Sequence, residues 1–138
     1  MFRTADAAGF TKLVLCGITP APVDRFGRVN KELAKVSLGA EKFVAWEKCK
    51  SAAAALKKLK KQGYKILALE QYKNSTPYFK FQTRSSKIAL VLGNEITGLP
   101  SSILKLADKI IEIPMRGRKE SLNVSVAFGI IAFNLAHD

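Results

Sequence analysis

Short apolar runs that alternate with amphipathic or polar stretches limit the fold of this chain more than any other feature. Five runs have the length and apolar continuity of buried strands: residues 13–18, 43–46, 66–69, 88–92 and 110–114. Strands that alternate with helices predict an α/β domain with a mostly parallel sheet and helices on both faces. Because we find no internal repeat and no interdomain linker, we expect residues 1–138 to form a single domain.

Helices are expected between these runs. Residues 51–62 place Ala52, Leu56 and Leu59 on one stripe, and the glycine that follows at position 63 is a typical helix stop. Residues 2–9 also have helical character and end in glycine, and one helical turn is expected near residues 31–35. We expect Ser101 to cap a helix that runs to about residue 107, and Ser121 to cap the last helix, with Asn123 in its first turn.

Basic charge is the strongest hint of a partner. Lys and Arg total 23 against 11 Asp and Glu, so the net charge is +12, and we expect a polyanionic partner, foremost nucleic acid. The lysines of residues 57–61 are interpreted as a solvated helix face. The longest apolar stretch, residues 126–136, is too short for a membrane span, and no signal peptide is visible, so a cytoplasmic protein without a membrane partner is expected.

Histidine and cysteine usage excludes several kinds of site. The single histidine, His137, stands next to the C-terminus, so catalysis through a Ser-His-Asp or Cys-His arrangement is not expected. Cys16 and Cys49 stand far apart and form no CxxC motif. We therefore expect two reduced thiols and no metal site.

A glycine-containing segment follows the fourth apolar run. Gly93 and Gly98 flank Asn94 and Glu95, and a loop with so little side chain at the end of a parallel strand lets backbone groups approach a ligand. The segment is neither a Walker A loop nor a dinucleotide fingerprint. The alternative is a plain strand-to-helix turn.

A basic loop follows the fifth apolar run. It carries Arg116, Arg118 and Lys119 and leads to Ser121 and Asn123. Arginine binds phosphate with two parallel hydrogen bonds, which favours an RNA-facing role for this loop. The alternative for the two polar residues is helix capping alone.

Three segments, taken in order, resemble a known family. Residues 2–9, 89–99 and 113–127 are similar to the three motifs of the SpoU/TrmH family of RNA ribose 2′-O-methyltransferases, within the SPOUT superfamily. The resemblance implies a SPOUT-type fold with a deep C-terminal trefoil knot, a homodimer, and S-adenosyl-L-methionine as cofactor. It implies methyl transfer to a ribose 2′-hydroxyl of tRNA or rRNA.

The resemblance also implies roles for individual residues. Arg3 would be the catalytic arginine, and the other catalytic residues would be Glu95, Ser121 and Asn123. The cofactor would be bound by Leu92, Gly93, Asn94, Gly98, Ile113, Met115, Ser121 and Leu122. RNA would be bound by Arg116, Arg118 and Lys119. Because guanidinium groups keep their proton in proteins, an electrostatic role for Arg3 is favoured over a role as a base.

One part of the family pattern is absent. The asparagine of the first motif, and the strand that carries it, would precede Met1, so the domain is expected to lack its first strand. An alternative function is therefore a module that binds cofactor and RNA but is catalytically impaired. A third hypothesis is a basic, ribosome-associated α/β protein without a cofactor.

Overall fold

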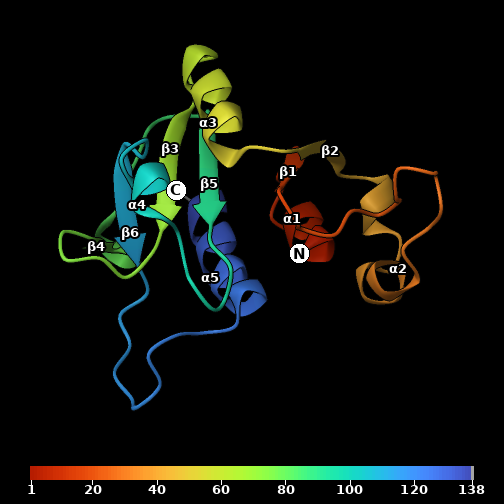
Figure 1. Cartoon of the computed structure of the whole chain (residues 1–138). Helices are drawn as coiled ribbons and strands as arrows, with labels where there is room; N and C mark the ends of the chain where they lie inside the picture. Colours follow the sequence, from red (N-terminus) through yellow and green to blue (C-terminus); the bar gives the residue numbers. More distant parts are fainter. Residues whose placement is uncertain (138) are drawn as a thin grey trace. The chain divides into compact units, whose positions relative to one another are not determined.

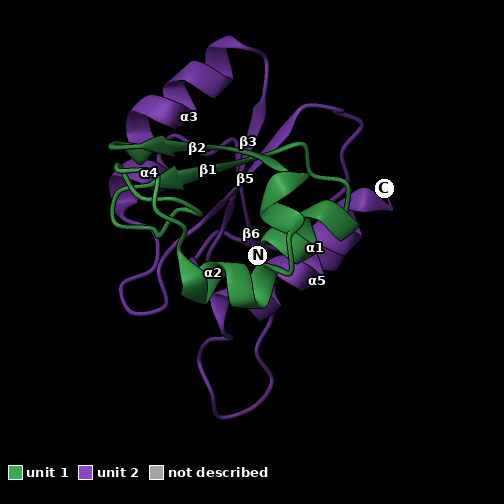
Figure 2. Ribbon diagram, turned by 90° about the vertical axis from the view of Figure 1, so that its right-hand side faces the viewer, with its two compact units in different colours: residues 1–52 green, residues 53–138 purple. Residues whose placement is uncertain are grey.

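The computed structural model describes residues 1–137, which divide into two compact units (Figure 2). The first unit spans Met1–Ala52, and the second begins at Ala53. The expectation of one domain over residues 1–138 stays a prediction. In the described residues, no helix is long and apolar enough to cross a membrane.

The first unit is built on two parallel strands, β1 (Lys12–Cys16) and β2 (Ala45–Cys49). It also contains α1 (Phe2–Ala7), α2 (Lys31–Ser37) and the short 3-10 helix η1 (Ala40–Lys42). α1 buries Phe2 and Ala5, and its end is followed by Gly9 in the left-handed region at φ +78°. That conformation suits glycine, which agrees with the helix stop predicted there.

The second unit is built on a four-stranded parallel sheet with the order β4-β6-β3-β5. The strands are β3 (Lys65–Leu69), β4 (Thr76–Pro77), β5 (Ile88–Leu92) and β6 (Lys109–Glu112). The short 3-10 helix η2 (Tyr78–Lys80) follows β4. β3 is central and buries three consecutive residues, Ile66, Leu67 and Ala68. A run buried on both faces requires helices on both sides of the sheet.

Helices of the second unit cover both faces of this sheet. α4 (Ser101–Leu104) and α5 (Val124–Ala136) lie on opposite sides of the strands (Figures 1 and 2), and α3 (Ala52–Lys61) precedes β3. On the α5 side, Leu67, Ile111 and Ile131 form a fully buried core cluster. This core packs β3 and β6 against α5.

The predicted α/β class and its parallel strands are confirmed, but several boundaries differ. The first strand ends at Cys16 instead of residue 18, the fifth apolar run leaves the strand after Glu112, and the helix expected to reach about residue 107 ends at Leu104. The second strand occupies residues 45–49 instead of 43–46, because Phe43 ends η1 in a helical conformation (φ −104°, ψ −28°) and cannot extend the strand. The two-residue strand β4 was not expected, since a proline stands in it.

Both predicted serine caps are wrong. Pro100 occupies the N-cap position of α4, so Ser101 is its first helical residue. Asn123 caps α5, and its side-chain oxygen accepts a hydrogen bond from the Ser125 amide at 2.8 Å. Asparagine caps helices as well as serine does, so the helix begins two residues later than expected, and Asn123 does not lie in the first turn.

Candidate active site

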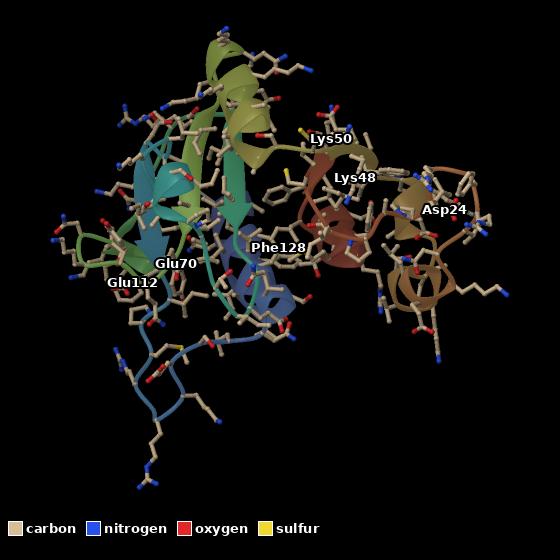
Figure 3. The ribbon with its side chains drawn as sticks, in the orientation of Figure 1. Asp24, Lys48, Lys50, Glu70, Glu112 and Phe128 are labelled. Atoms are coloured by element: carbon tan, nitrogen blue, oxygen red, sulfur yellow. The ribbon has the colours of Figure 1, made fainter. Side chains whose placement is uncertain are left out.

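A cleft of about 580 Å³ opens at the carboxyl ends of the strands in the second unit. Its lining comes from the residues that follow β3, β5 and β6, together with residues from α4 and the start of α5. Figure 3 shows Glu70 at the end of β3, in this region. Open parallel sheets bind ligands at this edge, and the volume suits a small organic molecule.

The loop after β5 is held together by its own hydrogen bonds. The Asn94 side-chain oxygen accepts from the backbone amides of Ile96 at 2.9 Å and Thr97 at 2.7 Å. The Asn94 amide group donates to the Thr97 hydroxyl at 2.7 Å, and the Gly98 amide donates to the Asn94 carbonyl at 3.1 Å. Asn94 therefore shapes the loop from within.

Two glycines allow this loop to close. A Cβ atom at Gly93 would lie 2.4 Å from the Gly98 carbonyl carbon and 2.6 Å from the Leu99 nitrogen. A Cβ atom at Gly98, where φ is +65°, would lie 2.4 Å from Oε2 of Glu70. Backbone thus packs on backbone at Gly93, and the Glu70 carboxylate packs on backbone at Gly98, so a side chain at either position would force its surroundings to shift.

Glu70 braces the same loop from the neighbouring strand. Its Oε2 accepts from the Leu99 amide at 2.8 Å, and its Oε1 accepts from the Gln71 amide at 3.0 Å. Sequence reasoning missed Glu70 because it belongs to none of the three motifs. An acidic residue directly after a buried strand that ends at the predicted site was the available signal.

The loop after β6 has no such bracing. Residues 115–122 form no hydrogen bond and no ion pair within the part of the chain that the structure describes. The loop extends away from the sheet (Figure 1), with Arg116, Arg118 and Lys119 exposed and Met115 and Leu122 half-buried. Of all the parts of the cleft, we therefore expect this loop to change its conformation most when a ligand binds.

Most of the predicted site residues line the cleft. The cleft lining includes all the residues that were predicted to bind the cofactor: Leu92, Gly93, Asn94, Gly98, Ile113, Met115, Ser121 and Leu122. Glu95 lines it as well, whereas Asn123 is not among the lining residues. Arg3 lies in α1 of the first unit with an exposed side chain. Other lining residues had no predicted role: Thr97, Leu99 and Glu120 lie within the motif segments, and Glu70, Gln71 and Tyr72 lie outside them.

The charge of the cleft is opposite to that of the chain. Three carboxylates, of Glu70, Glu95 and Glu120, line it, and no Lys, Arg or His does so among the residues that the structure describes. Carboxylates attract cations and repel phosphates, so the cleft favours a neutral or cationic ligand over a nucleotide. Among residues 1–137, no group of three or more His, Cys, Asp or Glu side chains is placed to hold a metal ion.

The sequence profile of the SpoU rRNA Methylase family matches residues 1–133, which spans both units and all three motifs. The chain belongs to the SpoU rRNA Methylase family. The match confirms the resemblance drawn from residues 2–9, 89–99 and 113–127.

Relatives in this family are methyltransferases by name. The chain is 39% identical over 131 residues to the tRNA (guanosine(18)-2′-O)-methyltransferase of Aquifex aeolicus, covering 95% of this chain and 58% of the relative. It is 34% identical over 134 residues to the 23S rRNA (guanosine-2′-O-)-methyltransferase RlmB of Ralstonia nicotianae, covering 95% and 49%. The chain thus spans about half the length of the curated relatives it matches.

Solved structures of the family share the fold. The A. aeolicus TrmH/SpoU tRNA modifying enzyme superposes with a TM-score of 0.82 at 32% identity, covering 99% of this chain and 65% of that chain. The AdoMet-bound rRNA methyltransferase from Sinorhizobium meliloti superposes with a TM-score of 0.85 at 26% identity, covering 99% and 49%.

Proposed function

We propose that this SpoU-family chain transfers a methyl group from S-adenosylmethionine to a ribose 2′-hydroxyl of tRNA or rRNA. The observation that carries the proposal is the acidic cleft at the carboxyl ends of the sheet, built from the family's second and third motifs. The names of the relatives support the substrate class, since they act on tRNA or 23S rRNA at a 2′-oxygen.

The residues of the cleft fit S-adenosylmethionine. The cofactor carries positive charge on its sulfonium and ammonium groups, which the three lining carboxylates would attract. Its adenosine would pack on the apolar side chains of Leu92, Ile113, Met115 and Leu122. The glycine-containing loop after β5 would present backbone groups to it. When bound, the cofactor supplies an electrophilic methyl group.

The basic residues of the loop after β6 would bind the RNA. Arg116, Arg118 and Lys119 are exposed and form no ion pair in the described chain, so they can pair with phosphates. Their loop ends at the cleft, through Ser121 and Leu122. RNA bound there would lie next to the methyl donor.

Arg3 would stabilise the negative charge that develops on the attacking 2′-oxygen. A guanidinium keeps its proton, so it acts here through its charge, and water or an RNA phosphate would accept the hydroxyl proton. Glu95 and Ser121, both lining the cleft, would help to orient the substrate. Asn123, the N-cap residue of α5, would complete the set of catalytic residues.

Family membership supports three further proposals. These are the deep C-terminal trefoil knot, a homodimer, and a cytoplasmic location, where tRNA and rRNA are modified. The exposed apolar residues Val126 and Phe133 of α5 support the homodimer, because they offer an apolar surface to a second copy.

The test is methyl transfer to bulk tRNA and rRNA, followed by nuclease digestion and mass spectrometry of the nucleosides. We expect 2′-O-methylated nucleosides with the wild-type chain and none with Arg3→Ala, whose affinity for S-adenosylmethionine stays within about twofold. A methyl group on a base would contradict the proposed reaction. A near-full rate for Arg3→Lys would contradict the role of Arg3.

The same samples separate the two alternatives. Cofactor binding without transfer by the wild-type chain would favour a catalytically impaired RNA-binding module. RNA binding without any cofactor binding would favour a ribosome-associated protein.

A further inference from the structure

An exposed turn in the first unit, residues 22–30, carries an unusual combination of side chains. We name it the arginine turn. The ring of Phe26 is 67% exposed, although large aromatic side chains are normally buried for the most part. The guanidinium carbon of Arg25 lies 4.8 Å from the ring centroid, and that of Arg28 lies 5.1 Å from it. Both distances are in the range of cation–π attraction.

Asp24 fixes the shape of this turn (Figure 3). Its Oδ1 accepts from the backbone amides of Phe26 at 2.8 Å and Arg28 at 2.9 Å, and its Oδ2 accepts from Arg28 Nε at 2.7 Å. The Arg28 amide, together with the Arg28 guanidinium and the Phe26 amide, holds the pKa of Asp24 below its usual range. The carboxylate thus stays charged near neutral pH and keeps the turn closed.

Backbone pairing on both sides adds to this order. Val23 and Val29 form an antiparallel bridge, and the Asp24 amide donates to the Arg28 carbonyl at 2.9 Å. The Asn30 amide donates to the Pro22 carbonyl at 2.8 Å, and the Asn30 side chain caps α2. The turn is therefore a preformed element that holds Phe26 outward, which lowers the entropy lost when a ligand binds the ring.

The two arginines are not equivalent. Arg28 is bound to Asp24, so its main role is to close the turn. Arg25 forms no ion pair with a carboxylate in the part of the chain that the structure describes. Its guanidinium can therefore pair with a phosphate or stack on a base while it stays near the Phe26 ring.

An exposed aromatic ring beside a guanidinium that has no carboxylate partner among residues 1–137 suits single-stranded RNA. Bases of single-stranded RNA stack on aromatic rings and on arginine planes, and the neighbouring phosphates pair with the guanidinium. Bases in an A-form duplex are already stacked and cannot reach such a ring. A carboxylate of a protein partner could pair with Arg25 as well, but the net charge of +12 on the chain favours a polyanion.

We propose that the arginine turn binds unpaired nucleotides of RNA, with Phe26 as the stacking platform and Arg25 as the phosphate contact. This inference rests on the proposed function only for the identity of the RNA. The arginine turn would be a second RNA-binding surface of the chain. It lies in the first unit, whereas the cleft lies in the second.

The test measures binding of labelled 12-nucleotide single-stranded RNA and of a duplex of equal length by fluorescence anisotropy. Phe26→Ala should weaken binding of the single strand roughly five- to twentyfold, because a stacked base is lost. Phe26→Tyr should stay within about twofold, since tyrosine keeps the ring. Arg25→Gln should lower the slope of log affinity against log salt by about 0.7, the value for one phosphate contact on a single strand.

Lys57→Gln is the matched control for charge, because Lys57 is an exposed cation on α3. It should change the affinity less than twofold, and duplex binding should be insensitive to Phe26→Ala. The proposal is overturned if Phe26→Ala binds the single strand like the wild-type chain, if Lys57→Gln causes an equal loss, or if the wild-type chain binds no RNA. Circular dichroism checks that each variant is folded.

A parallel titration with S-adenosylmethionine keeps the two proposals apart. Phe26→Ala should bind the cofactor like the wild-type chain. If the wild-type chain binds single-stranded RNA through Phe26 but no cofactor, the proposed methyl transfer fails and the inference on the arginine turn stands. If cofactor binding and transfer persist in Phe26→Ala with no loss of RNA affinity, the inference fails and the proposed function stands.

Discussion

The two loops that form most of the cleft differ in how they are held. The loop after β5 is closed by Asn94, by the contact between Gly93 and Gly98, and by Glu70 from the neighbouring strand. The loop after β6 forms no hydrogen bond over residues 115–122 in the described chain. One side of the cleft is therefore preformed, and the shape of the other depends on what binds.

This difference matches the two proposed ligands. The cofactor is small and always the same, so a rigid loop can be complementary to it before it binds. RNA is large and flexible, and the loop that would meet it carries Arg116, Arg118 and Lys119 without internal partners. The same contrast predicts which substitutions affect the cofactor and which affect RNA.

Gly93→Ala should have the largest effect. Its Cβ atom would lie 2.4 Å from the Gly98 carbonyl carbon, so the braced loop must shift. Overpacking of this kind costs about 1–3 kcal/mol, and we expect affinity for S-adenosylmethionine to fall roughly 10- to 100-fold in calorimetry. Gly117→Ala in the open loop is the control, since nothing lies within 4 Å of its added Cβ. Equal affinities of Gly93→Ala and Gly117→Ala for S-adenosylmethionine would refute the proposed difference between the two loops.

Replacing Arg116, Arg118 and Lys119 together by glutamine should have the next largest effect, on RNA alone. Loss of up to three phosphate contacts should weaken tRNA binding about tenfold and reduce the salt slope by about 2. Affinity for S-adenosylmethionine should stay within about twofold, because these residues do not line the cleft. A larger loss of cofactor affinity than of RNA affinity would show that the loop serves the cofactor.

Glu70→Gln should have a moderate effect. The amide keeps one acceptor oxygen, so only one of the amides of Gln71 and Leu99 keeps its partner. Loss of one hydrogen bond costs about 1 kcal/mol, so we expect the affinity for S-adenosylmethionine to fall three- to tenfold. Glu112→Gln is the matched control, because Glu112 ends β6 at the same edge of the sheet but does not line the cleft. If Glu70→Gln and Glu70→Ala both bind S-adenosylmethionine as tightly as the wild-type chain, Glu70 has no bracing role.

Asn123→Ala should have the smallest effect, and it should act on stability. Loss of the cap on α5 should lower the free energy of unfolding by about 1 kcal/mol in urea titrations. Ser121→Ala, at the cap position that the sequence favours, should lower it by less than about 0.5 kcal/mol. A larger loss of stability in Ser121→Ala than in Asn123→Ala would mean that α5 begins at the earlier cap position in solution.

The contrast also explains what the sequence could predict. The strands of the second unit were predictable because β3 and β5 are continuous apolar runs. The cleft-lining residues Gly93 and Gly98 were singled out because they follow an apolar run, whereas Met115 was assigned only through the family resemblance. The position of Glu70 directly after a buried strand was a usable signal for the site, but its bracing role depends on a contact with Leu99, 29 residues away, which no local pattern encodes.

The caps and the start of the second strand were missed for a different reason. Pro100 directly precedes Ser101, and Asn123 follows Ser121 by two residues, so each helix has two residues able to start it and the local sequence alone does not decide between them. Phe43 is apolar, as a strand residue would be, yet the 3-10 helix before it fixes its backbone in a helical conformation. Apolar patterning does not record such local geometry.

The most direct test of the central claim is a calorimetric titration of the chain with S-adenosylmethionine in the presence of ATP. Both ligands contain adenosine, but ATP is an anion, and the cleft presents the carboxylates of Glu70, Glu95 and Glu120. We predict that S-adenosylmethionine binds one site per chain and that a roughly tenfold excess of ATP does not displace it. Absence of cofactor binding, or its displacement by ATP, would contradict the account.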